Sequence, residues 1–418
     1  MNHFSRRAFL KVGSIAPFGY LSWGDVLRAQ GKPKKDISVI QLWLGGGLSH
    51  IDSFDPKPDC DAKYRTLFKT IPTKVDGLQF CEHLPLSAKQ ADKYVVIRWM
   101  THKEGSHEKA STLLLTGHDE LPTIKHPAVG AVVSKEFGPR NELPAFVSIP
   151  GGRSRNGSGF LGPQHNPFAA GDPNVPNYSV RDLNLPMGVD WARMEGRYSL
   201  LSLVDSNIEK WDTSTTFESI DSYYKSALEL VRSPRAKKAF DIAAEPEKLR
   251  DAYGRTGMGQ GCLLARRLVE AGVRFITVSR GNWDHHTNVF PNLANEYLPE
   301  LDRAFAALVE DLAGRGMLDS TLVLVTGEFG RTPEINLYGG RDHWPNAFSL
   351  AIAGAGIQGG RVWGASDQNG MFVQDNPIEA QDLIATIFYK LGIDLDKEYL
   401  SNIGRPIKMA HGKPLAFL

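Results

Sequence analysis

Short apolar runs rich in valine and isoleucine alternate with helical patterns along this 418-residue chain, and this alternation limits the fold more than any other feature. Each run is bounded by glycine, proline or charged residues, which is typical of a strand buried on both faces. The runs cover residues 37–44, 94–98, 146–149, 273–278, 321–326 and 348–353. We therefore expect a sheet whose two faces are both covered.

Two helical patterns lie among the later runs. Leucine and phenylalanine repeat at spacings of three and four over 298–312, and Gly314 and Gly316 end this pattern. A second pattern over 249–271 leads directly into the run at 273. Strand, helix and strand in this order imply parallel pairing with right-handed crossovers. The sequence predicts an α/β fold with a mainly parallel central sheet.

One region departs from this alternation. Residues 151–190 are crowded with glycine, proline and asparagine, and residues 195–245 have a helical composition. Long loops in compact domains are usually functional or disordered. We expect a single domain over 31–418 with a loop-rich and helical insertion around 151–245, and the part at 153–165 is a candidate substrate-selecting lid.

The N-terminus has the order of an export signal. Arg6 and Arg7 precede an apolar stretch over 12–23 and a small-residue cleavage point at Ala29. This order is typical of a twin-arginine signal peptide, here residues 1–30, and the alternative is a basic arm on a cytoplasmic protein. The apolar stretch is shorter than the ~20 residues that span a bilayer, so we expect no permanent membrane span. The translocase would be a partner during export, and the mature protein would be periplasmic or extracellular.

Composition excludes other classes. The 48 basic and 47 acidic residues nearly cancel, so nucleic acid is not expected as a partner. Three cysteines form no disulfide framework and no cysteine-built metal site. Cys60 and Cys81 are close enough in sequence to pair after export, and Cys262 lies in a helical pattern typical of the core. No nucleophile elbow, phosphate-binding loop or zinc-protease helix motif occurs.

Polar clusters follow four of the apolar runs. The carboxyl ends of parallel strands share one edge of a sheet, so these side chains are expected to form one site. The clusters are His50, Asp52 and Asp55; His102, Ser106, His107 and His118; Asp284, His285, His286 and Asn288; and Glu328, Arg331, Asp342 and His343.

Imidazoles that meet carboxylates suit a divalent cation, and the metal could be zinc, calcium or manganese. Singly, each of these residues is more often a loop or capping group, and Asp52 in particular may only cap a helix. The clusters therefore predict a shared polar site more strongly than a bound ion.

Several strings in this chain resemble a known family. GGGLSHIDSFDPKP, GCLLARRLVEAGVRFITV, WDHH, GEFGRTPEIN and GRDHWP, in this order behind a twin-arginine signal, are similar to the bacterial family called domain of unknown function 1501. That family is placed among relatives of the sulfatases and alkaline phosphatases. The resemblance implies an alkaline phosphatase-like three-layer α/β/α sandwich, and a metal-dependent hydrolytic centre.

The superfamily pattern implies roles for individual residues. His107 stands seven residues before Leu114-Leu115-Thr116-Gly117, where relatives carry a serine, threonine or cysteine nucleophile, and Ser106 replaces it only if the loop shifts by one. The resemblance implies that Asp284, His286 and His343 hold the cation. Further metal candidates are Glu328, which stands where relatives carry an aspartate, and Asp52 and His50 after the first strand.

Two hypotheses follow. In the first, an exported metal-dependent hydrolase cleaves a phosphate or sulfate ester, either a small anionic ester or a sulfated or phosphorylated glycan. His107 would act as acid, base or phosphoryl acceptor, and Arg331 would pair with the anionic group. Arg331 may instead anchor a loop through Glu334 or Asp342. In the second hypothesis, the chain has the same fold but is a non-catalytic binding or scaffold protein of the envelope.

Overall fold

The computed structural model describes residues 36–418 except 152–156, 181–182, 184–187 and 209–227. The predicted signal peptide at 1–30 lies outside the described residues. So do parts of the predicted lid and of the helical insertion.

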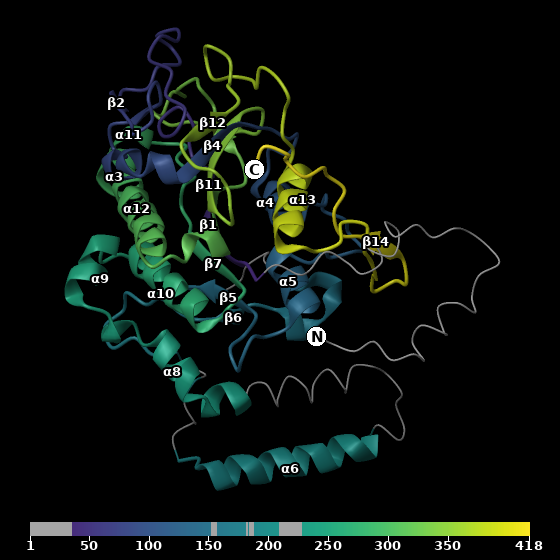
Figure 1. The fold of residues 1–418 in the computed structure, drawn as a ribbon. Helices are drawn as coiled ribbons and strands as arrows, with labels where there is room; N and C mark the ends of the chain where they lie inside the picture. The colour runs from purple at the N-terminus through teal and green to yellow at the C-terminus, as the bar shows by residue number, and fades with distance from the viewer. Residues whose placement is uncertain (1–35, 152–156, 181–182, 184–187, 209–227) are drawn as a thin grey trace, which may run out of the picture.

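An eight-stranded sheet forms the centre of the molecule (Figure 1). Strand β11 runs antiparallel to its neighbours β4 and β8, and the other pairs are parallel. The mainly parallel sheet expected from the sequence is therefore confirmed. In spatial order the strands are β12 (Arg361–Trp363), β4 (Tyr94–Met100), β11 (Phe348–Gly354), β8 (Thr321–Thr326), β1 (Ser38–Leu44), β7 (Phe275–Arg280), β5 (Phe146–Ile149) and β6 (Phe168–Ala169).

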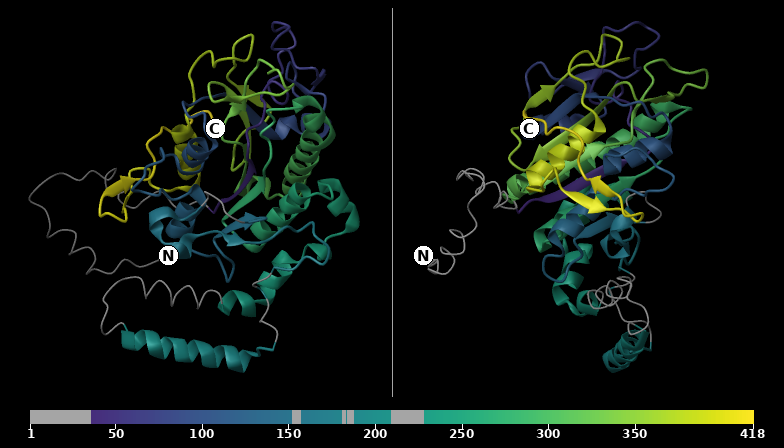
Figure 2. Two further views of the ribbon diagram at one scale, coloured as in Figure 1. Left: turned by 180° about the vertical axis from the view of Figure 1, so that it is seen from behind. Right: turned by 90° about the vertical axis from the view of Figure 1, so that its right-hand side faces the viewer.

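Helices cover both faces of the sheet, which gives a three-layer α/β/α sandwich (Figures 1 and 2). Alternate residues of β1 enter two different cores: Ile40 and Leu42 pack on one face, and Val39 packs on the other. The first face is covered by α3 (Pro85–Lys89), α8 (Pro234–Phe240), α10 (Gly257–Ala271) and α12 (Leu298–Gly314). The second face is covered by α4 (His107–Thr116), α5 (Val129–Phe137) and α13 (Ala380–Leu391).

Shorter elements complete the described part of the chain. Three small two-stranded sheets pair β2 with β3, β9 with β10, and β13 with β14. Among the described residues, no helix has both the length and the apolar character needed to cross a membrane. These strands are β2 (Thr70–Pro72), β3 (Gln79–Cys81), β9 (Gly330–Arg331), β10 (His343–Trp344), β13 (Glu398–Leu400) and β14 (Pro406–Lys408). The other helices are α6 (Trp191–Ile208), α9 (Glu247–Tyr253), α11 (Val289–Asn292), the π-helix η6 (Leu293–Tyr297), and the 3₁₀ turns η1 (Ala91–Lys93), η2 (Gly159–Leu161), η3 (Pro163–His165), η5 (Ile242–Ala244) and η7 (Leu318–Ser320).

The helix predicted over 249–271 is wrong in one respect, because the chain forms two helices there, α9 and α10. Gly254 ends α9 with a φ of 91°, a conformation that glycine adopts readily. The side chain of Thr256 then caps α10 by accepting a hydrogen bond from the Gly259 N–H at 3.1 Å. Apolar residues stand on both sides of this break, Tyr253 before it and Met258 after it, so the apolar pattern alone does not reveal it.

All three cysteines are free and buried in the structure. Cys60 and Cys81 are therefore not joined, although their spacing left that pairing open. Burial raises the pKa of the Cys81 thiol to about 12. A thiol with such a pKa is a poor nucleophile and a poor metal ligand near neutral pH.

The direction of the strands decides where the polar clusters meet. The carboxyl ends of β1, β4, β7 and β8 lie at one edge of the sheet, because these strands run the same way. Strand β11 is reversed, so its first residue, Phe348, lies at that same edge. The residues that precede β11, including those of β10, are thereby brought to the ends of the other strands.

Candidate metal centre

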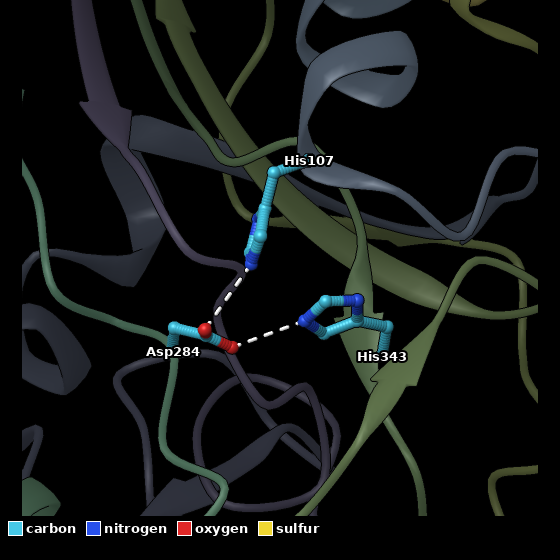
Figure 3. A group of neighbouring side chains, drawn as sticks. All are labelled: His107, Asp284 and His343. Atoms are coloured by element: carbon cyan, nitrogen blue, oxygen red, sulfur yellow. Dashed lines mark hydrogen bonds and ion pairs between the residues drawn. The ribbon is translucent and has the colours of Figure 1, made fainter.

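Three side chains from separate segments meet at this edge (Figure 3). His107 is the first residue of α4, Asp284 lies in the loop after β7, and His343 belongs to β10. One ligand atom from each of the three lies within 4.8 Å of the others. Figure 3 shows both imidazoles directed at the carboxylate of Asp284 from different sides.

His286 joins the same group from the loop after β7. Its Nε2 lies 2.9 Å from Oδ1 of Asp284 and 3.0 Å from Nε2 of His343. Nε2 of His343 lies 3.1 Å from the same carboxylate oxygen. The structure thus brings together the three residues that the sequence resemblance assigned to a cation.

In all three histidines, Nδ1 faces an acceptor on the side away from Asp284. His107 Nδ1 lies 2.7 Å from Glu328 Oε1, His286 Nδ1 lies 2.6 Å from Asp342 Oδ1, and His343 Nδ1 lies 2.8 Å from the Gly105 carbonyl oxygen. Carboxylates and carbonyls only accept, so each Nδ1 carries the proton. In the neutral rings, the lone pairs on Nε2 then point toward Asp284, which is how metal-binding histidines are usually held.

The donor set fits a divalent cation. Nε2 of His286, Nε2 of His343 and Oδ1 of Asp284 are separated by 2.9, 3.0 and 3.1 Å. Ligand atoms that share a cation at bond lengths of about 2.0–2.1 Å lie roughly 2.9–3.4 Å apart. Two lone pairs facing each other at such a distance also need a proton or a cation between them.

The charges around the site are strongly coupled. The hydrogen bond from His107 to Glu328 raises the pKa of His107, and the nearby charges of Glu328 and Asp284 add to this effect. Burial alone would raise the pKa of Asp284, but the hydrogen bond and charge of Arg331 hold it far below its usual value. Burial lowers the pKa of His343, which keeps its ring neutral. The site therefore contains one imidazole with a raised pKa, His107, and one with a lowered pKa, His343.

Arg331 is buried and donates to protein acceptors through all three of its side-chain nitrogens. Its side chain is 1% exposed, and it donates to the carbonyl oxygens of Gly46, Gly47 and Arg341 and to Oδ1 of Asp284. Of the two interpretations of Arg331, the loop anchor matches these contacts. Its carboxylate partner is Asp284, where the sequence had suggested Glu334 or Asp342.

The glycine loop after β1 lets the backbone pass close to the site. Gly46 has a φ of 118°, and a Cβ there would lie 2.5 Å from the Asp284 nitrogen. A Cβ at Gly47 would lie 2.7 Å from the ring of Phe329. The Gly46 N–H donates to Oε1 of Glu328 at 2.8 Å. This loop therefore holds Glu328 against His107.

Phe329 forms an apolar wall beside two of the imidazoles. It is buried and stacks on His343 with ring centroids 4.6 Å apart. Its centroid lies 5.1 Å from that of His107. An apolar wall of this kind holds both rings in place without competing for the cation.

The structure does not bring Asp52 and His50 into this group, so we leave both out of the proposed site. Asp52 is fully buried, and Arg341 donates to both of its carboxylate oxygens, at 2.8 and 3.1 Å. The hydroxyl of Ser49 donates to Oδ2 as well, at 2.6 Å. His50 is buried and its Nε2 lies 2.8 Å from the Gly370 carbonyl oxygen. These residues hold the loop after β1 against the rest of the protein.

Glu328 contacts the centre only through His107. Its Oε1 is taken by His107 and the Gly46 N–H, and it is not among the residues whose ligand atoms form the described group. The structure thus gives Glu328 an orienting contact with His107, and its role as a ligand stays a prediction.

The remaining residues of the clusters have other partners. Ser106 caps α4, with its hydroxyl 3.4 Å from the Lys109 nitrogen. His102 binds the Glu328 carbonyl oxygen at 2.7 Å, and His285 packs on Tyr297. His118 stacks on His126.

Trp283 is buried, and the Trp344 Nε1–H donates to the Met371 carbonyl oxygen at 2.6 Å. Both tryptophans pack loops.

The described part of the candidate lid contacts α5. The side chain of Ser134 on α5 lies 3.1 Å from Nδ1 of His165. Phe160 packs against His126 with ring centroids 6.2 Å apart. Residues 152–156 lie outside the described part, so the lid itself stays a prediction.

Sequence reasoning missed the roles of Asn336 and Asp342. Asp342 holds Nδ1 of His286, and the amide of Asn336 donates to Asp342 Oδ1 at 3.2 Å. Both residues lie inside the strings GEFGRTPEIN and GRDHWP. Their place in these strings was visible, but their partners depend on the hairpin formed by β9 and β10.

Family comparison agrees with these strings. Residues 36–417 match the model of a family described as Protein of unknown function (DUF1501). The chain belongs to this family. The resemblance of the DUF1501 motifs is thereby confirmed across nearly the whole described chain. A comparison with curated proteins gives no match.

Solved structures similar to this DUF1501 chain include three enzymes. The sulfatase PsFucS1 from Pseudoalteromonas sp. is 13% identical and has a TM-score of 0.36, and the alignment covers 88% of this chain and 70% of that one. The phosphonate monoester hydrolase of Agrobacterium radiobacter is 13% identical, with a TM-score of 0.33 and coverage of 91% and 79%. The alkaline phosphatase of the Antarctic bacterium TAB5 is 12% identical, with a TM-score of 0.32 and coverage of 81% and 97%. At TM-scores this low, the likeness carries no weight in assigning an activity.

Proposed function

We propose that this chain is an exported metal-dependent hydrolase of a phosphate or sulfate ester. One observation carries the proposal: His107, His286 and His343 each turn Nδ1 to a protein acceptor and Nε2 toward the carboxylate of Asp284. Holding three imidazoles in fixed orientations around one carboxylate costs free energy, and binding a cation would offset that cost. The set is also half-open to solvent, so a small ester can reach it.

Asp284, His286 and His343 would hold the cation. When bound, a divalent cation polarises an ester and lowers the pKa of a water that attacks it. Two imidazole nitrogens and one carboxylate favour zinc or manganese over calcium, which prefers oxygen ligands. Of zinc, calcium and manganese, which the sequence left open, this donor set therefore disfavours calcium.

His107 would act as the general acid. It sits at Oδ2 of Asp284, at 3.2 Å, on the other oxygen from His286 and His343. Glu328 holds its proton at Nδ1 and raises its pKa, which favours the charged form of the ring. A charged imidazole beside the site can give a proton to a leaving oxygen. Both ring nitrogens face carboxylates, which argues against a phosphoryl-acceptor role.

Arg331 and the start of α4 support the ligands and His107. Arg331 fixes Asp284 and the Gly46–Gly47 backbone from the buried side. His107 begins α4, and the positive end of a helix dipole favours an anion nearby. Since Arg331 is buried and all three of its side-chain nitrogens already donate to protein acceptors, the anionic group of the substrate is expected to meet the cation, His107 and this helix end instead.

In a second candidate function, the protein binds the metal but does not catalyse ester hydrolysis. The position where sulfatase-like enzymes carry a nucleophile is occupied by His107, and the nearby hydroxyl of Ser106 caps α4. A non-catalytic envelope binding or scaffold protein would show the same cation site without ester hydrolysis. The two functions are separated by assays on the metal-loaded protein.

The first test is elemental analysis of the mature protein, purified without chelator, beside Asp284→Ala/His343→Ala. The double variant Asp319→Ala/His411→Ala is a matched control, because both residues are exposed and lie outside the site. We expect one cation in the parent and the control and none in the site variant. Metal retained by a folded site variant would contradict the proposed centre.

The second test screens the metal-loaded protein with 4-nitrophenyl phosphate, 4-nitrophenyl sulfate and sulfated oligosaccharides. Turnover that disappears in Asp284→Ala/His343→Ala supports the hydrolase. A stoichiometric cation without turnover on any ester favours the binding protein.

Export is a separate part of the proposal. Replacing Arg6 and Arg7 by lysine should keep the precursor in the cytoplasm, since the twin-arginine pathway reads this pair. Cell fractionation measures the result. Unchanged export of the double-lysine variant would contradict the twin-arginine assignment.

A further inference from the structure

Asp342 lies outside the proposed ligand set and contacts it through one ring. Its Oδ1 lies 2.6 Å from Nδ1 of His286. Because a carboxylate only accepts, this contact keeps the proton of the neutral ring on Nδ1. The lone pair on Nε2 of His286 is then directed at Asp284 and His343.

Asn336 holds Asp342 and His286 together. Its Nδ2 donates to Oδ1 of Asp342 at 3.2 Å and to the His286 carbonyl oxygen at 3.0 Å. Its Oδ1 accepts from the N–H groups of Tyr338 and Gly340, each at 3.0 Å. One amide side chain therefore uses both of its ends to connect the hairpin loop with the loop that carries His286.

The backbone of Asp342 is fixed as well. Its N–H donates to the hydroxyl of Thr332 at 3.0 Å, and the Thr332 N–H donates to the Asp342 carbonyl oxygen at 2.9 Å. The adjacent Arg341 N–H donates to the His285 carbonyl oxygen at 3.0 Å. The carboxylate thus sits on a backbone with little freedom to move away from His286.

Stability alone does not explain so many contacts. The side chain of His286 is 42% exposed and that of Asp342 is 54% exposed, and ion pairs this open add little to the stability of a fold. An exposed imidazole otherwise samples several rotamers and both tautomers. The contacts hold His286 in one rotamer and one tautomer. Such a restriction benefits cation binding more than it benefits the stability of the fold.

We infer that Asp342 is a positioning residue for His286, with Asn336 as its anchor, and that the pair sets the affinity of the centre for its cation. This inference rests on the proposed function, because it takes His286 as a ligand. Asp342 binds no cation itself in this arrangement. It acts by keeping the tautomer and the direction of the imidazole.

The test is the zinc affinity of the mature chain, measured by competition with a chromophoric chelator. Loss of an orienting carboxylate typically costs about 10–100-fold in metal affinity, and we expect this loss in Asp342→Ala. Asn336→Ala and Asp342→Asn should give smaller losses, since each leaves part of the contact. Asp396→Ala is the matched control, because this carboxylate pairs with exposed Lys408 at 2.7 Å, and its affinity should stay unchanged.

A second readout separates positioning from a structural role. Nitrogen-15 NMR of the metal-free protein reports the tautomer of His286, and Asp342→Ala should increase the share of the Nε2–H form. A purely structural contact would change the unfolding midpoint without changing this share. Asp342→Asn has nearly the same shape as the parent and keeps the test valid if Asp342→Ala does not fold.

Unchanged zinc affinity and tautomer in a folded Asp342→Ala, beside a clear loss in His286→Ala, would overturn the inference and leave the proposed function standing. Unchanged affinity in His286→Ala itself would overturn both, because His286 would then not be a ligand.

Discussion

Nδ1 of His107 lies 2.7 Å from Glu328 Oε1, and Nε2 of the same ring lies 3.2 Å from Asp284 Oδ2. One imidazole therefore connects a buried carboxylate with the carboxylate of the proposed centre. The arrangement gives the site a held proton next to a place for a cation.

Replacing His107 by glutamine should keep the cation and lower ester hydrolysis by about 10²–10⁴-fold, the range typical of a lost general acid. The physical reason is that Asp284, His286 and His343 still provide three donors. Metal content and turnover are measured on the same sample. Loss of the cation in folded His107→Gln would instead make His107 a ligand.

Glu328→Gln should lower the pKa of His107, because the hydrogen bond to Glu328 is the largest cause that holds it above 6.5. A raised folded-state pKa stabilises the protein below pH 6.5, and this contribution is lost as the pH rises through the folded-state value. The stability gap between parent and variant should therefore be larger at pH 6 than at pH 9.

An NMR titration of His107 in metal-free protein checks this pKa, and urea unfolding at the two pH values checks the gap. Glu120→Gln, an exposed change, serves as the control. An unchanged titration of His107 in Glu328→Gln would show that the hydrogen bond does not hold the proton.

Asp52→Asn should destabilise the fold by about 3–5 kcal/mol, because it leaves the guanidinium of Arg341 buried without its counter-charge. Both side chains of the pair are 0% exposed. Urea unfolding measures the loss. Asp92→Asn breaks an exposed pair with Lys74 and should cost about 0–1 kcal/mol.

The same variant tests whether Asp52 belongs to the metal centre. The folded fraction of Asp52→Asn should keep its cation, since Asp52 contacts Arg341 and Ser49 and none of the proposed ligands. A folded variant without metal would return Asp52 to the ligand set.

His118 should make the protein less stable in acid. It is buried against His126, with stacked ring centroids 4.1 Å apart. Burial lowers the pKa of His118 to about 3, and the charges of His126 and His411 lower it further. The unfolded chain then binds more protons than the folded chain between about pH 6.5 and 3, so stability falls across this window as the pH falls.

His118→Phe should flatten the fall by up to about 1.4 kcal/mol per pH unit, the value for one proton, because phenylalanine cannot charge. Urea unfolding between pH 7 and 4 measures the slopes. Equal slopes in parent and variant would mean that His118 is accessible to protons in the folded state.

Much of the fold could be predicted from the sequence. The strands that became β1, β5 and β8 were placed to within a residue, because valine and isoleucine runs ended at glycine, proline or charge. The reversal of β11 could not be predicted, since an apolar run has no signal for the direction of its neighbours. The break between α9 and α10 was missed because apolar residues stand on both sides of Gly254, at Tyr253 and Met258.

The site could be predicted in part for a physical reason. Asp284, His286, His343 and His107 follow strands or precede one at the same edge, so topology alone brings them together. Asp52 follows a strand equally closely, yet it pairs with Arg341, which lies 289 positions away in sequence. Such a pairing depends on which long-range partner arrives, and local patterns do not contain that information.

The reversed strand has a consequence for how this site can vary. Phe348 enters the sheet at the edge where β1, β7 and β8 leave it, so Asp342 and His343 belong to a hairpin and not to a strand–helix crossover. Changing the length of that hairpin moves no helix of either layer. The side chains of Leu337 and Tyr338 at its tip are fully or largely exposed and can therefore be exchanged at little cost to the fold, whereas the Tyr338 backbone is bonded to Asn336 and Asn288 and fixes the length of the tip.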